Sequence, residues 1–296
     1  MSQKDIVVET IKDGPKSIKE IASVTGIVEP NVRRILGMGA KEGVFERIER
    51  GVYTLSRNGE DIAVVHTADA VENLPRLVDE GLRADVVFLD LPYTTPAVKG
   101  GNRPQKFKVI TPDQFGTVMN AIAKMVRTDD SPVYYISSTA PSGQKEMDKY
   151  NNKLFAAGFK LVAEGEYVKL QSDGVSISTN PQGKPTSPEK LQLFTKSGMF
   201  NEKDLPRNLN FRVIRPAVAG KNGRQAQKPK EMAKSLILQG TRIGEVVADV
   251  FAGTGIILAT AVELGRKAFG MEIDVDAVNG FIIPRLRTAA GMGNLF

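Results

Sequence analysis

Cysteine is absent from the chain of 296 residues, and histidine occurs once, at His66. The absence of cysteine excludes disulfides, thiolate metal sites and thiol nucleophiles. A single histidine excludes a histidine-based zinc cluster and argues against a Ser-His-Asp triad. His66 lies within the apolar run 62–67, which predicts a strand residue and not a catalytic one. We therefore expect chemistry that uses no metal.

Long apolar runs are also missing. No run approaches the roughly 20 residues that a membrane-spanning helix requires, and the first five residues do not begin a signal-peptide core. We expect a cytosolic protein without membrane contact. A composition of 41% hydrophobic and 25% charged residues is typical of globular proteins, and the length allows one large α/β domain and a small module.

Positive charge is concentrated in one part of the chain. Residues 169–234 contain thirteen Lys and Arg against five Asp and Glu, a net +8, whereas the whole chain carries +6. Such a concentration indicates a surface that faces phosphates, although a solvated polar face is the alternative.

The first 57 residues predict a small module of three helices and a hairpin. Helical spacing marks residues 4–13, Ser17-Ile-Lys-Glu20 is a capping box that begins a second helix, and Pro30 starts a third over 31–42. Residues 44–48 and 52–55 predict a hairpin. This order resembles a winged helix-turn-helix, in which the third helix, here with Arg33 and Arg34, enters the major groove. Ten basic against eight acidic residues leave a protein-contact or dimerisation role open.

A buried strand that ends in polar residues is the central feature of the second domain, 58–296. Val86–Leu89 predicts a strand covered on both faces, and Asp90-Leu-Pro-Tyr93 follows at its carboxyl end, where open α/β sheets bind ligands. The Asp90 carboxylate and the Leu91 carbonyl can accept the two hydrogens of an exocyclic amine, and Tyr93 can stack on the base that carries it. This arrangement suits a flipped nucleobase.

A glycine loop predicts the second half of the site. A strand over 246–251, the tight loop Ala252-Gly-Thr-Gly255, a helix over 256–264 and a strand over 267–272 form one βαβ unit. The glycines allow close backbone approach to a ligand at the start of the helix. Glu272, nineteen residues after Gly253, can accept both hydroxyls of a ribose. Leu258 stands where a dinucleotide fingerprint would have glycine.

Further elements complete the expected doubly wound α/β sheet. We expect a strand over 62–67, a helix over 112–126, a strand over 133–138, a helix over 146–157 and extended structure over 159–169. Residues 172–224 are polar and rich in proline, which predicts a loop-rich insertion of the kind that is usually functional.

Several segments resemble the motifs of the beta class of S-adenosylmethionine-dependent DNA amino-methyltransferases, in that class's order. Asp90-Leu-Pro-Tyr93 is similar to its Asp-Pro-Pro-Tyr signature, with Leu91 replacing the first proline. Phe251-Ala-Gly-Thr-Gly255 matches its Phe-x-Gly-x-Gly pattern, Gln227-Lys-Pro229 matches a segment that supports the methionine end of the cofactor, and Ala68-Asp69 resembles its Gly-Asp segment. The resemblance covers residues 60–290.

The resemblance implies a Rossmann-like methyltransferase fold, S-adenosylmethionine as cofactor and double-stranded DNA as partner, with 172–224 as the target-recognition region. It assigns catalysis to Asp90, Leu91, Pro92 and Tyr93, and cofactor binding to Asp69, Lys228, Pro229, Asp249, Phe251, Ala252, Gly253, Thr254, Gly255, Glu272 and Ile273. The basic residues expected at DNA are Arg33, Arg34, Lys99, Arg103, Lys106, Arg212, Arg215 and Arg224.

The implied reaction is methyl transfer to the exocyclic amine of a flipped DNA base. Cytosine-C5 chemistry is excluded because it needs a cysteine nucleophile. Adenine N6 is favoured over cytosine N4 because members of the family that act on cytosine generally carry serine at the position of Asp90, and a carboxylate is the stronger acceptor. RNA methylation and a DNA-binding regulator with an inactive methyltransferase domain stay open. A homodimer and a role in restriction-modification are further expectations.

Overall fold

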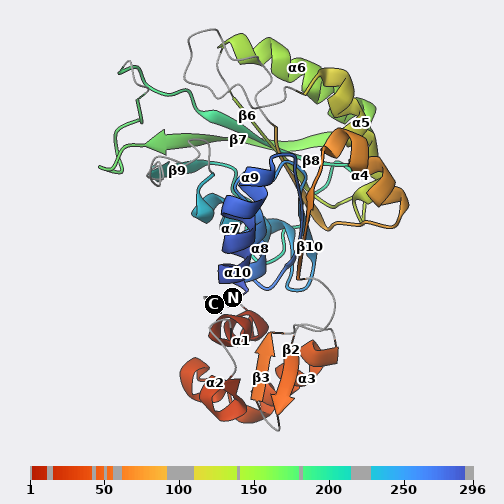
Figure 1. Ribbon diagram of the computed structural model, residues 1–296. Helices are drawn as coiled ribbons and strands as arrows, with labels where there is room; N and C mark the ends of the chain where they lie inside the picture. Colours follow the sequence, from red (N-terminus) through yellow and green to blue (C-terminus); the bar gives the residue numbers. More distant parts are fainter. Residues whose placement is uncertain are drawn as a thin grey trace.

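The computed structural model describes residues 2–11, 16–41, 45–49, 52–55, 62–91, 110–138, 141–179, 183–214 and 228–290. A small N-terminal module lies beside one end of a large α/β domain (Figure 1). Among the helices in these ranges, none is long and apolar enough to cross a membrane.

The N-terminal module contains three helices and a small antiparallel sheet. Its elements are α1 (Gln3–Ile11), β1 (Lys16–Ser17), α2 (Ile18–Thr25), α3 (Glu29–Lys41), β2 (Phe45–Glu49) and β3 (Val52–Leu55), with strand order β1-β3-β2. The predicted capping box is present, because Glu20 N–H bonds the Ser17 hydroxyl and Ser17 N–H bonds the Glu20 carboxylate. The predicted helices and hairpin are therefore confirmed, with ends shifted by one or two residues, whereas β1 was not expected.

This module has its own core, separate from that of the large domain. Val7, Ile21, Val32 and Leu36 are fully buried in it. Ile243 of the large domain packs against this core, so the two parts touch through apolar side chains. The predicted boundary between residues 57 and 58 lies outside the described residues, and the winged helix-turn-helix assignment stays a prediction.

The large domain is built on an eight-stranded sheet with the order β4-β11-β10-β5-β6-β8-β7-β9. The strands are β4 (Ala63–Thr67), β5 (Val86–Asp90), β6 (Val133–Ser138), β7 (Lys160–Leu170), β8 (Glu189–Thr195), β9 (Phe211–Ile214), β10 (Val246–Asp249) and β11 (Lys267–Glu272). From β4 to β6 all neighbours are parallel, and β8 then runs antiparallel to both β6 and β7. The doubly wound sheet is confirmed, with an antiparallel addition at one side.

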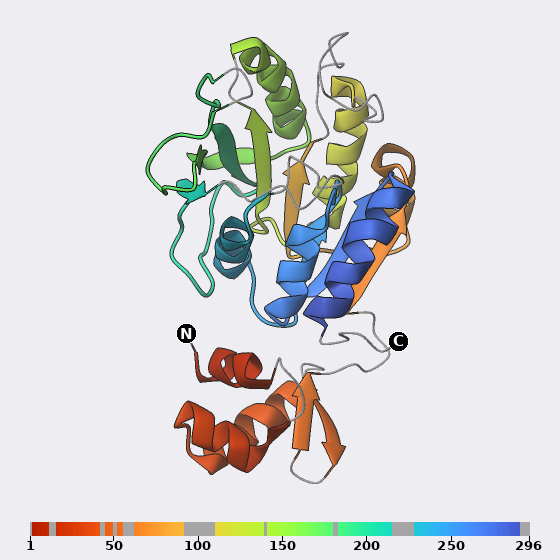
Figure 2. The same cartoon turned by 60° about the vertical axis from the view of Figure 1, so that its left-hand side comes forward.

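Helices cover both faces of the sheet (Figures 1 and 2). One layer contains α4 (Ala70–Asp79), α5 (Pro112–Met125) and α6 (Pro141–Ala156), and the other contains α7 (Lys230–Gly240), α8 (Ile256–Glu263) and α10 (Ile283–Ala289). The short α9 (Val275–Ala277) and a π-helical turn (Val278–Ile282) precede α10.

The central strands supply side chains to two cores, one on each face. Along β5, Val87 and Leu89 pack in the core under α4 and α5, whereas Val86 and Phe88 pack in the core under α7 and α8. All four are at most 1% exposed, as expected for a strand buried on both faces. His66 lies in β4 as predicted, paired with Met271 and in ring contact with Phe269.

Two sequence expectations need correction. The helix expected over 146–157 begins at Pro141, because proline at the start of a helix loses no intrahelical hydrogen bond. The region 172–224 is not loop-rich throughout, since Glu189–Thr195 forms β8, an interior strand bonded on both edges. Its short apolar segment, Leu191 to Phe194, lies between polar stretches rich in proline, which masked it in the sequence.

Candidate active site

The predicted site lies at the carboxyl ends of three neighbouring parallel strands. Asp90 ends β5, Asp249 ends β10 and Glu272 ends β11, and hydrogen-bonded pairing keeps these strands adjacent. The helix that follows β5 in the chain, α5, covers one face of the sheet, and the helix that follows β10, α8, covers the other face. Such a point opens a crevice beyond the strand ends, which is the usual ligand site of doubly wound sheets.

The glycine loop and Glu272 are joined directly. Gly253 N–H donates to Oε2 of Glu272 at 2.7 Å, and Asp274 N–H donates to Oε1 at 2.9 Å. Gly255 has φ 73°, and a Cβ there would lie 3.0 Å from the Ile282 side chain, so glycine is required. At Gly253 an added Cβ would approach no described atom closer than the Phe251 carbonyl oxygen, at 3.9 Å, which leaves room for a ligand beside the loop.

Asp249 is a buried carboxylate next to this loop. It is 3% exposed, and its Oδ1 accepts a hydrogen bond from Phe251 N–H at 3.2 Å. Burial, with repulsion from Asp90, raises the pKa of Asp249 to about 8. A ligand ammonium group at this place would favour the charged form of the Asp249 carboxylate. S-adenosylmethionine fits these groups. Its methionine amino group could pair with Asp249, its ribose hydroxyls could donate to Glu272, and the open glycine loop leaves room for it.

Asp90 pairs with a lysine from a distant part of the chain. Nζ of Lys228, just before α7, lies 2.9 Å from Oδ2 of Asp90 and 2.9 Å from Oε2 of Glu189 at the start of β8. The Lys228 side chain is 8% exposed, whereas that of Asp90 is 34% exposed. The lysine side chain is therefore buried, whereas the Asp90 side chain keeps partial access to solvent at the end of β5. Lys228, which we expected at the cofactor, forms ion pairs with Asp90 and Glu189, and its contact with the cofactor stays a prediction.

The protonation states of this cluster follow from burial and from the ion pairs. Burial raises the pKa of Asp90 above its usual range, and the Lys228 charge opposes that rise. Burial favours a low pKa for Lys228, but attraction to Asp90 and Glu189 is stronger, so the pKa of Lys228 is raised. Glu189 is also buried, yet Lys228 and Lys169 lower its pKa to about 2. Lys228 and Glu189 are therefore charged at neutral pH.

Other predicted cofactor residues surround the same edge. Ala252 N–H bonds the Met271 carbonyl, and the Thr254 hydroxyl accepts a bond from Arg285. Ile273, beside Glu272, is 50% exposed. Pro229 is the N-cap residue of α7. Lys228 therefore lies directly before the start of this helix.

Asp69 has a local structural contact at this edge. Its carboxylate accepts a bond from Val71 N–H and caps α4. Ala68 N–H bonds the Glu272 carbonyl, so the end of β4 lies beside the end of β11. A contact of Asp69 with the cofactor stays a prediction.

Several predicted residues lie outside the described part of the chain. These are Pro92 and Tyr93 of the signature, Gln227, and the basic residues Lys99, Arg103, Lys106, Arg215 and Arg224. Leu91 is described and is partly buried against the core under α4 and α5. The stacking role of Tyr93 therefore stays a prediction.

Of the basic residues that we expected at DNA, three lie in the described part of the chain. Arg33 and Arg34 are exposed on α3, and Arg212 is exposed on β9. Within the described part of the basic region 169–234, five lysines form ion pairs with carboxylates: Lys169, Lys190, Lys196, Lys228 and Lys230. The charges of these five lysines are thus paired within the protein.

Sequence reasoning missed Glu189 and Lys169 as members of the site cluster. The available signal was an acid directly after Pro188 at the head of a short apolar segment, which suggests a charged group at the end of a buried strand. That signal is weak, because the sequence does not show that β8 inserts beside β6.

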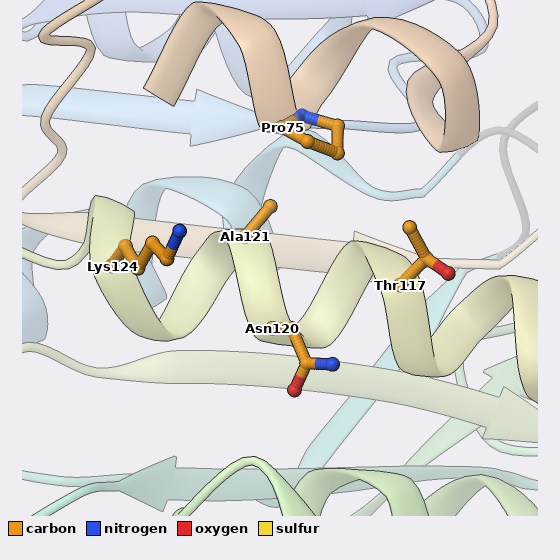
Figure 3. A pocket seen from close by; sticks show the side chains of 5 residues that line it. All are labelled: Pro75, Thr117, Asn120, Ala121 and Lys124. Atoms are coloured by element: carbon orange, nitrogen blue, oxygen red, sulfur yellow. The ribbon is translucent and has the colours of Figure 1, made fainter. Parts of the chain in front are cut away.

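A small hollow lies elsewhere, between α4 and α5 (Figure 3). It has a volume of about 180 Å³ and is lined by Pro75, Thr117, Asn120, Ala121 and Lys124. Ligand pockets usually measure about 300–1,000 Å³. The hollow contains none of the charged residues at the strand ends, so it does not compete with them as the site.

Comparison with known proteins supports the same assignment. The DNA methylase family model matches residues 141–282, a range that includes Lys228, the glycine loop and Glu272 but not Asp90. A DNA adenine methyltransferase of Escherichia coli strain K12, YhdJ, is 31% identical over 250 residues, which cover 75% of this chain and 82% of the relative.

Solved structures share the fold. The complex of M1.HpyAVI with S-adenosylmethionine has a TM-score of 0.56 at 18% identity and covers 76% of this chain and 98% of its own. The cytosine-N4-specific PvuII DNA methyltransferase has a TM-score of 0.55 at 12% identity and covers 78% of this chain and 86% of its own. The fold alone thus does not separate the two target bases. The chain belongs to the N6/N4 family of DNA methylases, and S-adenosylmethionine is its cofactor.

Proposed function

We propose that this DNA methylase transfers the methyl group of S-adenosylmethionine to N6 of adenine in double-stranded DNA. The observation that carries the proposal is the Asp90 carboxylate, which is partly exposed at the end of β5, next to the strand that leads into the glycine loop, and is paired with buried Lys228. The similarity to an adenine methyltransferase supports the same base.

Asp90 and Leu91 orient the target amine in this proposal. The nitrogen lone pair of adenine N6 is delocalised into the ring, which makes it a poor nucleophile. The Asp90 carboxylate and the Leu91 carbonyl accept hydrogen bonds from the two N–H groups of this amine. These hydrogen bonds localise the nitrogen lone pair on N6, so that it points toward the methyl group. Stacking on Tyr93 would contribute about 1–3 kcal/mol to holding the flipped base. The residues therefore act through orientation and electrostatics.

The other carboxylates hold the cofactor. Glu272 accepts ribose hydroxyls and Asp249 receives the methionine ammonium group, whereas the glycine loop allows close approach of the backbone. When bound, the cofactor supplies a methyl group activated by a positively charged sulfur. The adenine nitrogen bonds the methyl carbon, the electron pair of the broken carbon–sulfur bond stays on sulfur, and the nitrogen releases one proton to water.

Expression in cells that lack DNA methylation tests the choice of base. Sequencing with modification-sensitive reads should show N6-methyladenine and give its sequence context. N4-methylcytosine would contradict the adenine assignment while keeping the family reaction. Labelled methyl transfer to RNA but not to duplex DNA would contradict the proposed substrate, and cofactor binding without any transfer would favour an inactive regulator.

The N-terminal module supplies a second DNA contact in this proposal. Arg33 and Arg34 are exposed on α3, whose opposite side packs in the core of the module through Val32 and Leu36. Removal of residues 1–57 should weaken duplex binding and lower methylation at low DNA concentration, with recovery at saturating DNA. A dimerisation module would instead convert a dimer to a monomer in sedimentation without a change in monomer affinity. An insoluble truncation would contradict the proposed boundary.

A further inference from the structure

Four charged side chains form an alternating series that ends at Asp90. Lys169 on β7 pairs with Glu189 on β8, Glu189 pairs with Lys228, and Lys228 pairs with Asp90. The two residues at the far end are 23% and 15% exposed, so most of the series lies away from solvent. Two cations and two anions make its formal charge zero.

Such a series stays intact because each buried member needs its neighbour. A buried charge that loses its partner is strongly destabilised, whereas a paired one retains its charge. Lys228 touches two carboxylates, and Glu189 touches two lysines. Glu189 therefore limits how far Lys228 can move toward Asp90, and Lys169 limits how far Glu189 can move toward Lys228.

We propose that Glu189 and Lys169 are positioning residues that hold Lys228 against Oδ2 of Asp90 and so present Oδ1 to the amine of the target base. The inference rests on the proposed function, because it takes Asp90 as the acceptor of that amine. Neither residue touches the substrate in this arrangement. Their effect reaches the reaction through the charge and orientation of Asp90.

The charges around Asp90 set the direction of each expected effect. Burial raises the pKa of Asp90, Lys228 lowers it, Glu189 raises it and Lys169 lowers it. On the neighbouring strands, Asp249 and Tyr135 also interact electrostatically with Asp90. Burial raises the pKa of Tyr135, so this hydroxyl stays neutral through the relevant pH range.

The rate of methyl transfer should fall at low pH as Asp90 becomes protonated. Loss of the Lys169 charge in Lys169→Met should raise the pKa of Asp90 and move this acidic limb to higher pH. Loss of the Glu189 charge in Glu189→Gln should move the limb to lower pH. Each shift should measure about 0.5–1 pH unit, because Glu189 and Lys169 are the second and third neighbours of Asp90 in the series and do not touch it.

The experiment uses the full chain with saturating cofactor and duplex DNA in single-turnover transfer from pH 5 to 9. Lys169→Arg keeps the positive charge and is the matched control, expected to retain the wild-type limb. Saturating cofactor separates the Asp90 limb from titration of Asp249, which governs cofactor binding. Calorimetry should give the same cofactor affinity for wild type, Lys169→Met and Glu189→Gln.

Opposite shifts for the two variants support the inference, because loss of packing alone would lower the rate without moving the limb in opposite directions. Unchanged limbs in both folded variants overturn it. If Glu189→Gln does not fold, the more exposed Lys169→Met decides alone by the same criterion. A wild-type protein that transfers no methyl group to DNA would instead overturn the proposed function, which is a different result.

Discussion

Asp90 and Asp249 end adjacent strands of one sheet, yet their surroundings differ in one important respect. Asp90 has Lys228 at 2.9 Å, whereas the hydrogen bond described for Asp249 comes from a backbone N–H. Burial raises the pKa of both carboxyls, and that of Asp249 reaches about 8. In the proposed mechanism, the protein supplies a cation to the carboxylate that meets a neutral amine, Asp90. The other carboxylate, Asp249, would receive its cation from the bound ligand.

The largest expected effect comes from removal of the Asp90 carboxylate. Asp90→Ala should lower single-turnover methyl transfer by about 10²–10⁴-fold, because an orienting and electrostatic group is lost at the reacting amine. Cofactor affinity measured by calorimetry should stay within about twofold, because the carboxylates proposed to bind the cofactor, Asp249 and Glu272, end other strands, β10 and β11. Asp90→Asn keeps a neutral acceptor and should give an intermediate rate. Transfer by Asp90→Ala at the wild-type rate would refute the mechanism.

Removal of the Asp249 charge should give the opposite pattern. Asp249→Asn should weaken cofactor binding by about 2–5 kcal/mol, because one partner of a buried charge pair is lost. The transfer rate at saturating cofactor should change much less than for Asp90→Ala. If the cofactor binds Asp249→Asn with wild-type affinity in calorimetry, the ammonium group is not placed at this carboxylate.

The strand that carries Asp90 and the glycine loop could be predicted from the sequence, because both are marked by local patterns of apolar runs and turns. The pairing of Asp90 with Lys228 could not be predicted, since the two residues meet only when α7 packs on the sheet. Glu189 was hidden for a similar reason. Its strand takes its place through long-range pairing with β6, and the surrounding prolines resemble those of a loop.

Glu272 extends the comparison to a third strand end, where backbone N–H groups take the place of a lysine. Its two carboxylate oxygens already accept bonds from Gly253 and Asp274, which fix its orientation. Glu272→Ala should weaken cofactor binding by about 1.5–3 kcal/mol through the loss of ribose hydrogen bonds. Calorimetry with adenosine as well as the full cofactor provides the control, because adenosine contains the ribose but not the methionine part, so loss of a ribose contact weakens both ligands. Unchanged affinity for both would mean that the ribose lies elsewhere.

The smallest expected effect concerns stability, and it distinguishes the two aspartates without any substrate. The pKa of Asp249 is about 8 in the folded protein and about 3.9 when unfolded. The folded protein therefore binds the extra proton between these values, so the contribution of Asp249 to stability is greatest below pH 4 and declines as pH rises toward 8.

Asp249→Asn removes this dependence. The variant should gain stability relative to wild type as pH rises from 6 to 8, by an amount on the order of 1–2 kcal/mol, because the largest slope is about 1.4 kcal/mol per pH unit. Urea unfolding without cofactor at both pH values measures the gain. Asp90→Asn is the matched control, and it should lose stability instead, since it leaves Lys228 with one carboxylate partner fewer. A stability difference between wild type and Asp249→Asn that does not change with pH would show that Asp249 is already charged in the folded protein, and the contrast between the two strand ends would then fail.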